Sequence, residues 1–71
     1  MRQYTVLYER GPNNWSAYVP DLPGCIATGT TREELETLIR EAMAFHLEGM
    51  KLHGEPIPEP TIEAGLVEVQ A

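Results

Sequence analysis

The residues of this 71-residue chain that could take part in chemistry are one cysteine, two histidines and an aspartate held between prolines. Asp21 lies in the run Pro20-Asp21-Leu22-Pro23, which reads as a rigid turn. Metal-dependent nuclease chemistry needs several carboxylates that converge from different elements. The other acids mostly fall on the solvent side of a predicted helix or in a proline-rich segment. We therefore interpret Asp21 as a turn residue and not as a catalytic one.

Cys25 lacks the neighbours that a nucleophilic thiol needs, because such a thiol requires a base and a nearby cation or helix N-terminus. His46 and His53 both lie toward the far end of the predicted helix. They would sit about 10 Å apart along the helix axis, which is too far for one metal ion. We predict a buried Cys25, a His46 at the core edge or an interface, and no catalytic, cofactor or metal site.

The aromatic residues of the first predicted hairpin could stack with RNA bases, as in sheet-based RNA binders. Such a platform needs flanking basic residues, and this hairpin has only Arg2 and Arg10. The whole chain has five Lys and Arg against eleven Asp and Glu, a net charge of −6. An acidic surface repels phosphate backbones and attracts basic proteins. Direct nucleic-acid binding is therefore disfavoured, and protein binding is favoured.

The elements that position these residues follow from the hydrophobic pattern. Alternating side chains predict strands at 4–8, 15–19, 25–28 and 66–69. Thr31 as N-cap with Glu34 three residues later forms a capping box, and an apolar stripe then continues to Met50. The sequence predicts one α+β domain over residues 1–71: β-β-β-α-β, a small, mostly antiparallel sheet with one long helix on one face.

A domain of this size has a small core, so self-association as a dimer or tetramer is the expected source of further stability. A helix of about twenty residues is roughly 30 Å long and should overhang strands of roughly 20 Å. The overhanging end is predicted to bind protein. The residues proposed for this surface are Phe45, Leu47, Met50, Leu52, Glu41 and Glu48.

The chain shows no secretory signal pattern and no apolar run near the ~20 residues that cross a bilayer. Its lone cysteine fits a reducing compartment. These features predict a cytoplasmic protein without a membrane segment.

Two proline-containing runs give the sequence a family resemblance. Residues 15–25, which include Pro20, Asp21, Leu22, Pro23, Gly24 and Cys25, resemble the signature of HicB-type antitoxin domains. The helix start with Thr31 and Glu34, and the run Pro56-Ile57-Pro58-Glu59-Pro60, are similar to the same family.

The resemblance implies a partial RNase H-like fold without the catalytic acids of RNase H, and so no enzyme activity. It implies an antitoxin that neutralises HicA, a small basic mRNA-cleaving toxin, by covering its active site. The alternative is an orphan oligomeric interaction domain without a toxin partner. Family members often carry a C-terminal DNA-binding segment. This chain stops at Ala71, so we expect none here.

Overall fold

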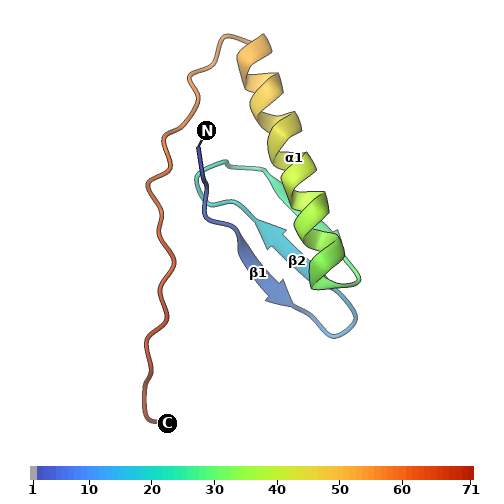
Figure 1. The fold of residues 1–71 in the computed structure, drawn as a ribbon, viewed down its shortest axis with the longest axis vertical. Coiled ribbons are helices and arrows are strands. Elements are labelled where there is room, and N and C mark those ends of the chain that lie inside the picture. Colours follow the sequence, from blue (N-terminus) through green and yellow to red (C-terminus); the bar gives the residue numbers. More distant parts are fainter. Residues whose placement is uncertain (1) are drawn as a thin grey trace.

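The computed structural model describes residues 2–71 as a three-stranded sheet followed by one long helix (Figure 1). The elements are β1 (Leu7–Arg10), β2 (Trp15–Tyr18), β3 (Ile26–Gly29) and α1 (Arg32–Leu52). The strands pair antiparallel in the order β1-β2-β3. The predicted α+β class and its β-β-β-α order are confirmed.

α1 begins and ends where the local sequence chemistry predicts. The Thr31 hydroxyl accepts a hydrogen bond from the Glu34 backbone N–H at 3.1 Å, which is one half of the predicted capping box, whereas the Glu34 carboxylate accepts from the Thr30 hydroxyl at 2.7 Å. At the other end Gly54 has a φ of 70°, and its N–H donates to the Lys51 carbonyl. The Glu55 N–H donates to the Met50 carbonyl, which completes a Schellman motif. Both ends of the helix are therefore fixed by contacts within a few residues.

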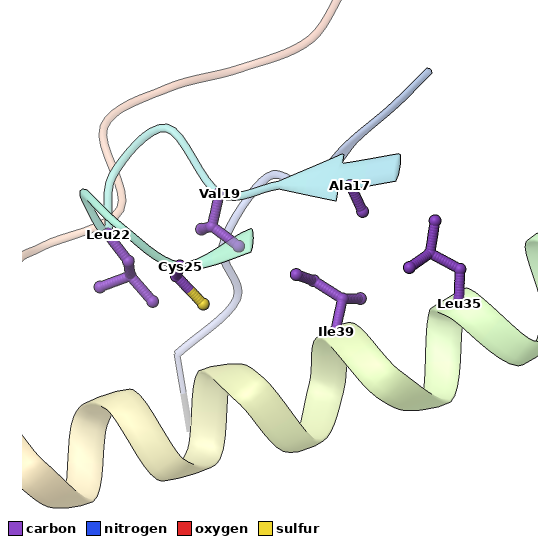
Figure 2. Close-up of a cluster of buried hydrophobic side chains, with 6 residues drawn as sticks. All are labelled: Ala17, Val19, Leu22, Cys25, Leu35 and Ile39. Atoms are coloured by element: carbon purple, nitrogen blue, oxygen red, sulfur yellow. The ribbon is translucent and has the colours of Figure 1, made fainter. Parts of the chain in front are cut away.

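The core lies between one face of the sheet and α1 (Figure 2). Leu22 and Leu35 are fully buried, and Ile39 is nearly so. The buried set is completed by three smaller side chains, Ala17, Val19 and Cys25. α1 packs on β3 and β2, so β1 is the strand least covered by the helix. On the opposite face of the sheet, Tyr18 and Ile26 are exposed, and no helix or strand of residues 2–71 covers them.

The first strand starts later than the alternating pattern predicts, at Leu7 instead of Tyr4. Its partner β2 ends at Tyr18, which pairs with Leu7. Beyond that point the Val19 N–H donates to the Cys25 carbonyl, so β2 has turned into a loop. Residues before Leu7 therefore have no strand to pair with.

Residues 66–69 form no strand, so the prediction of a fourth strand is wrong for this structure. After α1 the chain runs back past the sheet as an extended segment (Figure 1). Leu66, Val67 and Val69 are all exposed in it. A strand requires a neighbouring backbone for its hydrogen bonds, and within residues 2–71 no backbone hydrogen bond involves residues 66–69.

Candidate interaction surfaces

The loop between β2 and β3 is closed by two consecutive turns. The Leu22 N–H donates to the Val19 carbonyl, and the Cys25 N–H donates to the Leu22 carbonyl, each at 3.0 Å. The second turn has Pro23 at its second position and Gly24 at its third. Gly24 has a φ of 84°, as a type II turn requires. The loop points the Leu22 side chain into the core and turns Asp21 away from it (Figure 2 shows Leu22).

Asp21 holds the segment that follows the helix. Its carboxylate accepts hydrogen bonds from the Thr61 N–H at 3.0 Å, the Thr61 hydroxyl at 2.9 Å and the Ile62 N–H at 3.1 Å. The two partners lie 40 and 41 positions away in the sequence. We call this contact the Asp21 clamp. Asp21 therefore joins two distant parts of the chain, a role beyond the turn formation predicted for it.

The clamp changes the acidity of Asp21. Partial desolvation raises the pKa of its carboxyl, but the three hydrogen bonds from Ile62 and Thr61 outweigh that effect, so the pKa is lowered from 3.8. The clamp is strongest with the ionised carboxylate. Cys25 differs, because desolvation by burial raises the pKa of its thiol and opposes a nucleophilic role. The prediction of a buried Cys25 is confirmed.

The N-terminal residues hold the same segment from the other side. The Tyr4 hydroxyl and an Arg2 guanidinium N–H donate to the Pro58 carbonyl, and the Thr5 hydroxyl donates to the Ile62 carbonyl. Arg2 also pairs with Glu59 at 3.1 Å, although both side chains are well exposed. The anchored region of the post-helix segment is therefore residues 57–62, and the hydrogen bonds to it stop at Ile62 among the described residues.

The outer face of α1 carries a stripe of alternating acidic and apolar side chains. Glu41, Phe45, Glu48 and Leu52 follow one another at steps of four, three and four residues, so they share one helix face. Phe45 is 82% exposed and Leu52 is 79% exposed. The three ion pairs found within residues 2–71 use neither Glu41 nor Glu48. We call these four residues the outer stripe.

The other two predicted interaction residues lie elsewhere on α1. Met50 lines a hollow between the helix and the start of β3, which Phe45 also borders. Leu47 lines a separate hollow with Tyr4 and Ile57. Helical spacing therefore places four of the six predicted residues on one face of α1, Met50 shares a hollow with Phe45 at the edge of that face, and Leu47 borders a separate hollow.

The histidines and acids offer little for metal chemistry. His46 is half-buried beside the Met50 hollow, and His53 is the exposed C-cap residue of α1. In the described part of the chain, no three His, Cys, Asp or Glu side chains are grouped so that they could hold a metal ion. Nor does any helix of residues 2–71 combine the length and apolar character needed to cross a membrane.

Sequence reasoning missed Thr61 and the true partner set of Asp21. The available signal was weak: a carboxylate between two prolines has few local amides to accept from, because proline lacks an N–H. That points to a distant donor but does not identify it.

Comparison with known proteins places this chain in a defined group. A sequence model described as the HicB-like antitoxin of bacterial toxin–antitoxin systems matches residues 4–70. A UPF0150 protein of Thermoplasma acidophilum is 36% identical over 62 residues, which cover 86% of this chain and 90% of that protein.

An uncharacterized 14.9 kDa protein from the rep-hol intergenic region of Haemophilus phage HP1 is also 36% identical, over 56 residues. That match covers 79% of this chain but only 42% of the phage protein, so the chain spans less than half of this relative. No solved structure matches the chain.

Proposed function

Because this chain belongs to the HicB-like antitoxin family of bacterial toxin–antitoxin systems, we propose that it neutralises a small basic toxin of the HicA type. It binds the toxin through the outer stripe and covers the active site that cleaves mRNA. The antitoxin itself performs no catalysis and acts in the cytoplasm, where the toxin would meet mRNA.

The observation that carries this proposal is the composition of the outer stripe. A solvated helix face is usually polar throughout, whereas this face exposes Phe45 and Leu52 in alternation with Glu41 and Glu48. Burying an exposed side chain of this kind against a partner stabilises the complex by about 1.5–3 kcal/mol. Aromatic anchors with a polar rim are typical of binding hot spots.

The negative charge of the chain favours a basic protein as the partner. With a net charge of −6, two copies of this face would repel each other, but a basic protein would be attracted to it. The flanking carboxylates would speed encounter and fix the orientation of the partner, while Phe45 and Leu52 would supply most of the affinity. Such binding should weaken as ionic strength rises.

The test is co-expression with a small basic protein encoded beside this chain. Growth arrest by that protein alone should be relieved by this chain, and the two should co-purify as a complex. Phe45→Ala and Glu48→Lys should each weaken binding at least tenfold and restore toxicity. Glu9→Lys, an equal charge change on the exposed end of β1, is the matched control and should still neutralise.

An orphan interaction domain without a toxin is the second candidate function. The exposed apolar residues at 66–69 favour it, because self-association can bury them without any other protein. If no basic partner binds at micromolar concentration and the chain is still oligomeric by light scattering, this second function replaces the first.

A further inference from the structure

Gly49 occupies a position inside α1 that nothing else in the fold requires to be glycine. A glycine inside a helix destabilises it relative to alanine. The φ of Gly49 is not positive, unlike that of Gly24 and Gly54. A β-carbon placed on Gly49 would meet no atom within 4 Å outside its own part of the helix, whereas one on Gly29 would lie 3.4 Å from Leu35. Neither backbone conformation nor packing within the chain therefore explains this glycine.

The space above Gly49 is the Met50 hollow, which lies between α1 and the start of β3 and has a volume of about 440 Å³. Phe45 and Ile26 border it, and they are 82% and 68% exposed. The buried Cys25 also lines it. Two large apolar side chains therefore stay exposed around an open space that any side chain at position 49 would begin to fill.

This hollow differs in charge from the other two hollows beside α1. Glu55 lines it, and within residues 2–71 no lysine or arginine does. Arg2 lines both of the other hollows, with Lys51 in one and with Arg40 and Glu36 in the other. A basic partner is therefore attracted to the first hollow and meets cationic side chains at the other two.

The post-helix segment does not occupy the Met50 hollow. The hollow lies beside β3, and β1 is the opposite edge of the sheet. The Tyr4 and Thr5 hydroxyls, just before β1, hold the segment at the Pro58 and Ile62 carbonyls. The hollow is therefore left to another molecule, and it is continuous with the outer stripe through a shared residue, Phe45.

We propose that the Met50 hollow receives one large apolar side chain of the basic partner, and that Gly49 determines specificity because it leaves room for that side chain. This inference rests on the proposed function and extends it, since the partner then contacts the outer stripe and the hollow beside it. A matching partner segment carries an aliphatic or aromatic residue next to a lysine or arginine, whose cation pairs with Glu55. An apolar anchor in a pocket with a charged rim is typical of binding hot spots.

The first test is Gly49→Leu, which fills the hollow from the helix side. Calorimetric titration with the small basic protein encoded beside this chain should show binding weakened about tenfold or more, and neutralisation should be lost. The melting temperature should not fall, because leucine favours a helix more than glycine does. Ala44→Leu is the matched control. Ala44 is exposed and lies between Glu41 and Glu48 on α1, so this leucine stays outside the hollow and should leave binding unchanged.

The second test concerns the charge beside the hollow. Glu55→Lys should weaken binding of the same basic protein several-fold, mainly by slowing association, and should make binding less sensitive to salt. Glu9→Lys changes the net charge equally on β1 and should have a smaller effect on both measurements. If Gly49→Leu lowers the melting temperature, Glu55→Lys decides the question by itself.

The outcomes separate this inference from the proposed function. Unchanged binding by Gly49→Leu, or by Glu55→Lys where that variant decides, would overturn the inference and leave the proposed function standing. Failure of the unaltered chain to bind or neutralise would overturn both. If Gly49→Leu changes the mass of the chain alone in light scattering, the hollow holds a second copy of this chain and the inference is wrong.

Discussion

Two neighbouring parts of the post-helix segment behave in opposite ways. Residues 57–62 contact the folded domain through polar groups, with Asp21, Arg2, Tyr4 and Thr5 all bound to their backbone or side chains. Residues 66–69 are more apolar, yet their three apolar side chains are strongly exposed. Hydrophobic character alone therefore does not decide which part packs. What decides is whether a partner of the right shape lies within reach.

The comparison also separates two kinds of stabilisation. Residues 57–62 are held by directional hydrogen bonds from groups that the fold has already placed. The exposed apolar side chains of residues 66–69 would gain mainly from burial, which needs a complementary surface. The structure shows the first kind of stabilisation at residues 57–62, and the second kind is not made by Leu66, Val67 or Val69.

The largest expected effect comes from Leu22→Ala, because this substitution disturbs the loop that holds residues 57–62. Leu22 is fully buried, and its loop carries Asp21. Loss of the side chain should lower the free energy of unfolding by about 2–5 kcal/mol. Urea titration followed by circular dichroism measures this. Leu52→Ala is the matched control, because Leu52 is 79% exposed, and it should change stability by less than about 0.5 kcal/mol.

Asp21→Asn should release residues 57–62 while leaving the sheet and helix folded. The amide can keep at most part of the acceptor role of the carboxylate, because one of its two polar atoms is a donor. Hydrogen exchange at the amides of Thr61 and Ile62 should become faster, and exchange in α1 should not change. Unaltered exchange at both positions would contradict the clamp.

Acid should weaken the same contact by protonating Asp21. The pKa of Asp21 is lower in the folded chain than the usual 3.8, so the clamp stabilises the folded state above that pH. This contribution is lost as the pH falls through the lowered folded value. Nuclear magnetic resonance of the Thr61 and Ile62 amides between pH 6 and pH 2 should show this titration. Its persistence in Asp21→Asn would assign it to another group.

The smallest effect is expected in the exposed part. Leu66→Ser should change the unfolding free energy of the isolated monomer by less than about 0.5 kcal/mol, because the side chain contacts nothing there. The measurement is thermal unfolding at several protein concentrations. A large loss of stability at the lowest concentration would mean that residues 66–69 pack within their own chain.

Short-range chemistry made much of the fold predictable from sequence. The N-cap of α1 is set by Thr31 and Glu34, and its end by Gly54, all within a few residues of the contacts they make. The β1–β2 hairpin follows from two alternating runs joined by a turn. The Pro23-Gly24 turn follows because proline fixes one φ and glycine permits a positive one.

The remaining features could not be predicted from the sequence, because they depend on contacts between residues that lie far apart along the chain. The start of β1 depended on where β2 ends, and the role of Asp21 depended on amides 40 residues away. The apolar alternation at 66–69 predicted a strand but could not say whether an edge lies within reach. The candidate surface was half predictable, because helical spacing groups Glu41 with Phe45 but does not reveal that Leu47 borders a different hollow.

The sequence by itself determined the helix, the turns and the acidic character of the chain, because each depends on neighbouring residues or on composition. Only the tertiary structure decided that Asp21 holds the post-helix segment, that Met50 and Leu47 border two separate hollows, and that residues 66–69 remain unpaired. Those outcomes depend on which distant groups come within hydrogen-bond or packing distance, and the packing of α1 on β2 and β3 fixes those distances.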